Sequence, residues 1–179
     1  MYKRNFEEYK ELNDNPITNC GVTVGLVNEA SYDDWKITLI GPQDTYYKNG
    51  LFILNIHFPP EYPNKAPEVF FITPIYHLNV NPTAPKKPGD ESLGHICIST
   101  LNWWNPQYKI REVLLNIYSL FYMANVDSPY GINRAKEYIE NREVYEEKVK
   151  LFTQKYAKPH NKKNSTQSYE RDQNWDFNL

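Results

Sequence analysis

Apolar residues recur at helical spacing at the start of the chain. One face of this predicted helix is formed by apolar residues at steps of four and three, namely Tyr2, Phe6, Tyr9 and Leu12. Charged residues fill the remaining faces: Glu7, Glu8, Lys10 and Glu11. We expect the helix to end before Pro16, because proline lacks a backbone donor and clashes with the preceding turn.

Four later segments alternate between apolar and polar positions, which is typical of strands with one buried face. They span residues 22–26, 35–39, 52–58 and 69–72. The connectors between them are short, which favours an antiparallel meander. The stretch before the fourth strand cannot lie in the middle of a sheet, because it contains four prolines: Pro59, Pro60, Pro63 and Pro67.

Residues 74–110 show no periodicity, and a long irregular stretch inside a compact domain is typical of a functional loop. Helical spacing then returns in three segments at 110–121, 132–139 and 145–156, with Ile132 and Ile139 on the apolar face of the second. The sequence therefore predicts an α+β fold with an N-terminal helix, a four-stranded antiparallel meander, an active-site loop and three further helices.

The composition fits one domain followed by a tail. The chain has 179 residues, of which 40% are hydrophobic, and we expect a core domain at 1–157 and a polar, flexible tail at 158–179. A net charge of -2 without a basic stripe argues against nucleic-acid binding. No apolar run reaches the ~18 residues of a membrane span, and the N-terminus is too charged for a signal peptide. We expect a cytoplasmic or nuclear protein without membrane contact.

The two cysteines, Cys20 and Cys97, are expected to be free thiols, as is usual in a reducing compartment. Cys20 is interpreted as a small buried hydrophobic residue. The sequence has no Cys-x-x-Cys pair, and the remaining candidate ligands have no metal-site spacing: His57, His77, His95 and Cys97. We therefore expect no metal site.

Several short motifs follow one another through the irregular stretch and its flanks. They are Phe-Pro-Pro-Glu-Tyr-Pro at 58–63, Ala-Pro at 66–67, Tyr-His-Leu-Asn at 76–79, Gly-His-Ile-Cys at 94–97, Trp-Asn-Pro at 104–106, Leu-Leu at 114–115 and Asn-Val-Asp-Ser-Pro at 125–129. Read in this order, they resemble the core of ubiquitin-conjugating enzymes, which typically show Phe-Pro-x-x-Tyr-Pro, His-Pro-Asn, Gly-x-Ile-Cys and Trp-x-Pro before a leucine-rich helix. The resemblance extends from the first helix to Tyr156.

The resemblance implies an enzyme that accepts ubiquitin, or a ubiquitin-like protein, from an activating enzyme as a thioester on Cys97. It then passes the modifier to a substrate lysine or to a ligase. No cofactor is expected to bind, and ATP enters the pathway through the activating enzyme. Thioester exchange needs a thiolate nucleophile and hydrogen-bond donors for the oxyanion that forms on the carbonyl.

By resemblance, Asn79 is the side-chain donor to that oxyanion, or pins the loop that holds the cysteine. His77 has a structural role, in which its hydrogen bonds hold the loop. Ser128, with Asp127 beside it, matches the loop position at which the lysine approaches, where the amine must lose its proton.

The sequence departs from the family in two places near Cys97. Leu78 stands where the family has proline between the histidine and the asparagine, so the loop should be less restricted in the unfolded chain. Residues 82–93 form a polar, proline-rich insert, expected to be a surface loop that affects access, partner choice or chain linkage.

A partner-binding surface is implied at two further motifs, which contribute Pro63, Asn64, Trp104, Pro106 and Gln107. Asn64 occupies a position where many members that work with RING-type ligases carry a large apolar residue. Since an apolar anchor often carries most of an interface's energy, Asn64 puts a RING-type ligase in doubt. Trp103 and Trp104 are interpreted as core and loop anchors.

Two other functions compete with conjugation. A non-catalytic relative of the same fold would act as a binding module, but such variants typically lack the cysteine, and Cys97 is present. A cysteine hydrolase would pair Cys97 with His77 or His95 and would need a third group to orient the histidine. The sequence singles out no such group, and we interpret His95 as structural or exposed.

Overall fold

The computed structural model describes residues 4–81 and 94–158. Tyr2, the insert at 82–93 and the tail from residue 159 lie outside these ranges, so the expectations for them stay predictions. The elements in chain order are α1 (Arg4–Asp14), a 3-10 turn η1 (Thr18–Cys20), β1 (Val22–Asn28), β2 (Ser31–Ile40), β3 (Leu51–His57), β4 (Glu68–Phe71), α2 (Ser99–Asn102), α3 (Ile110–Leu120), α4 (Ile132–Glu140) and α5 (Arg142–Tyr156).

The four strands form one antiparallel sheet in the order β1-β2-β3-β4, which confirms the predicted meander. In the β2–β3 pair, Trp35 lies opposite Ile56 and Ile37 lies opposite Leu54. Side chains two residues apart on a strand share a face. The apolar row of β2 therefore meets that of β3, and its members are fully buried: Trp35, Ile37, Leu39, Phe52, Leu54 and Ile56.

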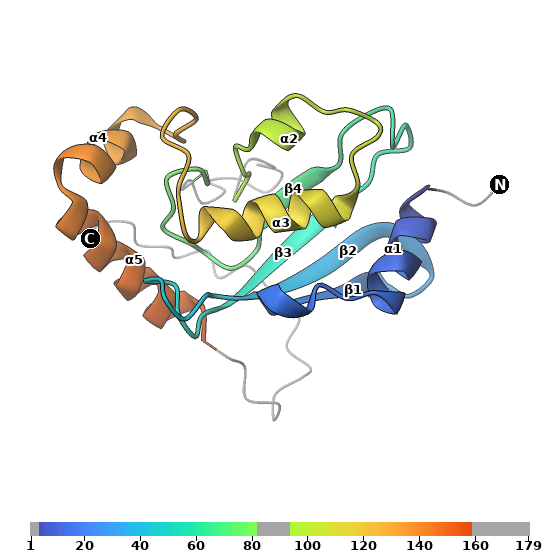
Figure 1. Ribbon diagram of the computed structural model, residues 1–179, viewed down its shortest axis with the longest axis horizontal. Coiled ribbons are helices and arrows are strands. Elements are labelled where there is room, and N and C mark those ends of the chain that lie inside the picture. The colour runs from blue at the N-terminus through green and yellow to red at the C-terminus, as the bar shows by residue number, and fades with distance from the viewer. Residues whose placement is uncertain (1–3, 82–93, 159–179) are drawn as a thin grey trace.

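Helix α3 covers the buried face of the sheet, with α1 at one end and α4 and α5 at the other (Figure 1). Its inward residues recur at helical spacing and are at most 1% exposed: Ile110, Val113, Leu114 and Ile117. They join the sheet residues in one hydrophobic core. Among the described residues, no helix is long and apolar enough to cross a membrane.

Three details differ from the sequence prediction. The prediction of three helices after the sheet was one too few, because α2 is a single turn of four residues, too short to show periodicity. Glu8 was expected on a solvent face of α1 but is only 4% exposed. Ile132 and Ile139, whose spacing predicted α4, do not pack against the core and are 76% and 69% exposed.

Candidate active site

Cys97 lies in an extended segment that runs beside residues 77–81. Its backbone N–H donates to Asn79 O at 2.8 Å, and its thiol is free and half-buried. The segment begins at Gly94, whose φ of 71° favours glycine. A Cβ at Gly94 would lie 2.2 Å from Phe71 O, so the motif's glycine allows the cysteine segment to approach β4.

The Asn79 side chain is fully buried and joins the cysteine segment to the loop after α3. Its Nδ2 donates to Asn125 O and to Ser128 O, both at 2.7 Å. Its Oδ1 accepts from the Asn125 backbone N–H at 2.8 Å. Both amide hydrogens and the amide oxygen are thus used to hold residues 125–128.

The His77 ring is buried and uses both nitrogens. Nε2 donates to Leu120 O at 3.0 Å, and Nδ1 accepts from the Asn79 backbone N–H at 3.0 Å. These partners require the neutral ring with its proton on Nε2. Burial lowers the pKa of His77 to about 4, more than the Leu120 carbonyl raises it, so the ring stays neutral at physiological pH.

The segment containing Leu78 is held from α4 and α5. The Leu78 backbone N–H, which proline would lack, donates to Tyr145 Oη at 2.9 Å. Arg134 Nη1 donates to His77 O at 3.1 Å and to Val80 O at 3.3 Å. The Leu78 side chain is 1% exposed. Leu78 is therefore built into the core, and its backbone donor has a partner.

Sequence reasoning missed a second amide beside the cysteine. Asn102, at the end of α2, directs Nδ2 toward Cys97 Sγ at 3.3 Å. The turn that places it is closed by Asn102 N donating to Ile98 O at 3.0 Å and Trp103 N donating to Ser99 O at 2.8 Å. The only sequence signal was its spacing, since a turn beginning just after Cys97 brings the fifth residue back toward it.

Ser128 and Asp127 lie in the loop that Asn79 holds. The Ser128 carbonyl accepts from Asn79, and the Asp127 backbone N–H donates to Asn125 Oδ1 at 3.0 Å. The Asp127 side chain is exposed and Ser128 is half-buried. The loop is thereby connected to the cysteine segment through the Asn79 side chain and backbone.

The two motifs with the predicted partner-binding residues contact each other. Trp104 Nε1 donates to Pro63 O at 2.7 Å, and the Trp104 and Tyr62 rings lie 5.9 Å apart. Trp104 is therefore a loop anchor as expected, but Trp103 is 81% exposed, so its interpretation as an anchor was wrong. The remaining members of the predicted set are exposed: Asn64, Pro106 and Gln107.

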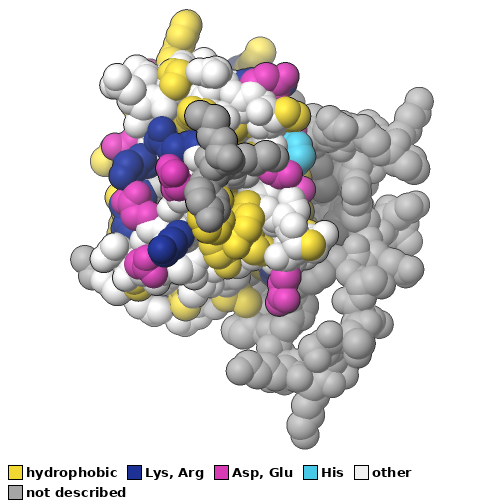
Figure 2. Space-filling model, turned by 90° about the vertical axis from the view of Figure 1, so that its right-hand side faces the viewer, with side chains coloured by type: hydrophobic (Ala, Val, Ile, Leu, Met, Phe, Trp, Pro, Cys, Tyr) yellow, Lys and Arg dark blue, Asp and Glu magenta, His cyan; other side chains and the backbone are white. Residues whose placement is uncertain are grey.

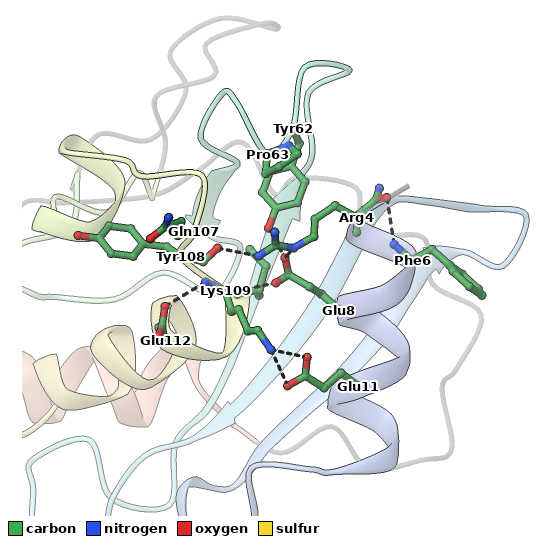
Figure 3. Close-up of polar contacts among 12 residues, drawn as sticks. Arg4, Phe6, Glu8, Glu11, Tyr62, Pro63, Gln107, Tyr108, Lys109 and Glu112 are labelled. Carbon is green, nitrogen blue, oxygen red and sulfur yellow. Dashed lines mark hydrogen bonds and ion pairs between the residues drawn. The ribbon is translucent and has the colours of Figure 1, made fainter. Parts of the chain in front are cut away.

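A buried carboxylate joins these loops to α1 (Figure 3). Glu8 accepts from Tyr62 Oη and from the Ile110 backbone N–H, both at 2.7 Å, and from Arg4 Nε. The Ile110 N–H belongs to the first turn of α3, where backbone donors lack helical partners and favour a negative charge. Burial and the nearby Glu8 raise the pKa of Tyr62, which keeps its hydroxyl protonated as a donor.

Lys109, next to Ile110, makes two further polar contacts at this end of the molecule. Lys109 Nζ lies 2.9 Å from Glu11 Oε2, while its backbone N–H donates to Glu112 Oε2 at 3.0 Å. On the same end of the molecule, hydrophobic side chains gather in a patch bordered by acidic and basic ones (Figure 2). An apolar patch with a charged border suits a protein-binding surface, which typically has an apolar centre and a polar rim.

His57, His95 and Cys20 make contacts other than with Cys97, His77 or Asn79. His95 stacks on Phe70 with ring centroids 6.3 Å apart, and His57 pairs with Asp34 on the sheet at 2.8 Å. Cys20 is half-buried against the core, and burial raises the pKa of its thiol. Within residues 4–81 and 94–158, no three His, Cys, Asp or Glu side chains form a group that could hold a metal ion.

Comparison with known proteins agrees with this fold. A model of the ubiquitin-conjugating enzyme family matches residues 4–153. Among solved structures, the E2 domain of a Toxoplasma gondii ubiquitin conjugating enzyme superposes with a TM-score of 0.72 at 29% sequence identity. The match covers 87% of this chain and 97% of that one. Because the family model spans most of the chain, from α1 into α5, this chain belongs to the ubiquitin-conjugating enzyme family.

Proposed function

We propose that this protein is an active conjugating enzyme that carries ubiquitin, or a ubiquitin-like protein, as a thioester on Cys97. The observation that carries the proposal is the surroundings of Cys97. A free, half-buried thiol stands in the Gly-His-Ile-Cys motif that resembles the family's, and backbone and side-chain hydrogen bonds hold the segments on either side of it.

Loading and transfer use the same sulfur. The Cys97 thiolate attacks the thioester of the activating enzyme, which releases that enzyme's own thiol and leaves the modifier's carbonyl on Sγ. A lysine amine, or the cysteine of a ligase, then attacks the same carbonyl and releases Cys97. Ser128 and Asp127 belong to the loop at which the amine approaches, and the exposed Asp127 carboxylate can accept a proton there.

Two roles were expected for Asn79, oxyanion donor or holder of the loop. Its hydrogen bonds support the second, because the amide nitrogen and the amide oxygen are both directed to residues 125–128. The contacts of His77 support a structural role for the same reason. They also argue against a Cys–His hydrolase that uses His77, since neither ring nitrogen is free to take a proton from Cys97.

The partners that follow from the proposal are ubiquitin or a ubiquitin-like protein, an activating enzyme that consumes ATP, and a ligase. The protein itself needs no bound cofactor. The touching loops with Pro63, Trp104, Pro106 and Gln107 supply a ligase-docking surface. The polar, exposed Asn64 on that surface favours a ligase whose contact does not depend on an apolar anchor at this position.

A charging assay tests the proposal. The protein is mixed with ubiquitin, its activating enzyme and ATP, and the products are run on non-reducing and reducing gels. We expect a heavier band that disappears with reductant and that is absent from Cys97→Ala. Cys97→Ser should give a band that resists reductant, because an oxygen ester forms in place of the thioester.

The assay is repeated with ubiquitin-like modifiers and their own activating enzymes if ubiquitin gives no band. A reductant-sensitive band with one of them identifies the modifier. Absence of a band with every modifier overturns the proposal in favour of the non-catalytic binding module.

A further inference from the structure

Two asparagine amides flank Cys97, and their hydrogen bonds differ. The Asn79 amide is buried and directs both hydrogens to the backbone of residues 125–128. The Asn102 amide is exposed, and its Nδ2 lies 3.3 Å from Cys97 Sγ. We propose that Asn102 supplies the side-chain hydrogen bond to the oxyanion that forms when the thioester on Cys97 is attacked. This inference rests on the proposed function.

The position of Nδ2 fits this role. The oxyanion is bonded to the carbon that is itself bonded to Sγ, so a donor within reach of the sulfur is also near the oxygen. An effective donor lies about 2.7–3.1 Å from the position of the oxyanion rather than of the ground-state carbonyl. Because Asn102 is exposed, rotation of its side chain can bring Nδ2 to that oxygen without disturbing the core.

The backbone beneath Asn102 is more constrained than its side chain. The α2 turn is closed by hydrogen bonds from Asn102 N to Ile98 O and from Trp103 N to Ser99 O. The turn begins two residues after Cys97, so donor and nucleophile belong to one short segment. The closed turn fixes the backbone from which Nδ2 projects, so the reorganisation needed during reaction is limited to the side chain.

The transfer step balances as follows. The lysine nitrogen lone pair forms a bond to the carbonyl carbon, and the carbonyl π electrons move onto oxygen, where Asn102 Nδ2–H donates. The proton that the attacking nitrogen carries in excess passes to solvent or to a nearby carboxylate. When the oxyanion reforms the carbonyl, the carbon–sulfur bond breaks, and Cys97 leaves as a thiolate that takes a proton from solvent. An amide suits the donor role because it does not titrate.

Single-turnover discharge tests the inference. Wild-type protein, Asn102→Ala and Asn102→Asp are charged to completion, the activating enzyme is stopped, and thioester loss is followed at several free-lysine concentrations. We expect Asn102→Ala to lower the maximal discharge rate by about 10- to 100-fold. Buried oxyanion donors contribute about 100- to 1,000-fold, and water partly replaces an exposed one.

The lysine concentration for half-maximal rate should stay within about twofold, because Asn102 acts on the transition state rather than on lysine binding. Asn102→Asp, which has the same shape but no donor and carries a negative charge, should discharge more slowly than Asn102→Ala. Asn13→Ala, at an exposed asparagine of α1, is the matched control and should discharge like the wild type. Melting temperatures of all variants should agree.

The possible failures are distinct. If wild-type protein forms no thioester with any modifier, the proposed function is overturned and the inference falls with it. If the wild type charges and discharges while Asn102→Ala discharges at the same maximal rate, the inference alone is overturned. A slower Asn102→Ala with an equally slow Asn13→Ala, or with a lowered melting temperature, also overturns it, because the effect would then come from general destabilisation.

Discussion

The two sides of Cys97 are built in opposite ways. On one side, the segment with His77, Leu78 and Asn79 is buried, and partners from α3, α4, α5 and the loop after α3 hold it by hydrogen bonds. On the other side, the α2 turn is closed by its own backbone and ends in the exposed Asn102. One side holds the backbone beside Cys97, and the other leaves the Asn102 amide exposed beside the sulfur.

The largest effect should come from removing the buried amide. Asn79→Ala leaves one backbone N–H and two carbonyls of the 125–128 loop without their partner, and a buried unsatisfied group costs about 1–3 kcal/mol. We expect a loss of about 4 kcal/mol in the free energy of unfolding, measured by urea titration. Asn102→Ala is the matched control on the exposed side, and an equal loss there would contradict the comparison.

The next effect is a pH dependence of the free energy of unfolding, caused by His77 in the buried segment beside Cys97. His77 has a pKa of about 4 in the folded protein, below the 6.5 of an exposed histidine. Below pH 6.5 the unfolded chain takes up a proton that the folded protein does not, so stability falls as pH decreases toward 4. One pKa unit corresponds to about 1.4 kcal/mol, which gives a loss of about 3 kcal/mol across this range.

Urea titrations between pH 7 and 4 measure this loss, with His77→Gln for comparison. The variant retains the carboxylates, including Glu11 and Glu146 with their lowered pKa values, so losses from those groups occur in both proteins. We expect a shallower decline for His77→Gln. Parallel curves would show that His77 does not cause the difference.

A smaller effect should follow from the donor that Leu78 adds. Tyr145→Phe leaves the buried Leu78 N–H unpaired, which should cost about 2 kcal/mol. In a Leu78→Pro background that N–H no longer exists, so the same change should cost about 1 kcal/mol less. Unfolding of the wild type, both single variants and the double variant gives the coupling, and strict additivity would refute this pairing.

The smallest effect is expected on the open side. Trp103 follows α2 and is 81% exposed, so Trp103→Ser should change the free energy of unfolding by less than about 0.5 kcal/mol. The neighbouring Trp104→Phe removes the hydrogen bond to Pro63 O and should cost about 1 kcal/mol. If Trp103→Ser lowered the free energy of unfolding more than Trp104→Phe, the residues around α2 would be packed rather than exposed.

Much of the fold was predictable because alternation and helical spacing persist over several residues. The rows of β2 and β3 gave the buried sheet face correctly, down to Trp35 and Phe52. The motifs also led to the segments that meet at Cys97, as the hydrogen bond from its backbone to Asn79 O illustrates. Family resemblance was necessary here, since neither residue has a distinctive pattern alone.

The remaining features depend on tertiary contacts that a local pattern does not contain. Glu8 looks like a solvent-facing residue because its partners are 54 and 102 positions away. The role of Leu78 N–H depends on Tyr145, 67 positions away. Asn102 was missed for a different reason, because a four-residue turn offers too few positions for helical spacing to be recognised.

The Glu8 carboxylate has a practical consequence for anyone shortening or tagging this protein. It is the shared acceptor for the start of α3, for Tyr62 beside the Pro63 loop, and for Arg4. A deletion of residues 1–8 would remove Glu8, and the Ile110 N–H and the Tyr62 hydroxyl would then lack their acceptor. If such a truncated form failed to bind a ligase, the cause would be the loss of the Glu8 hydrogen bonds that hold Tyr62 and the start of α3, and the result would not show that α1 itself contacts the ligase.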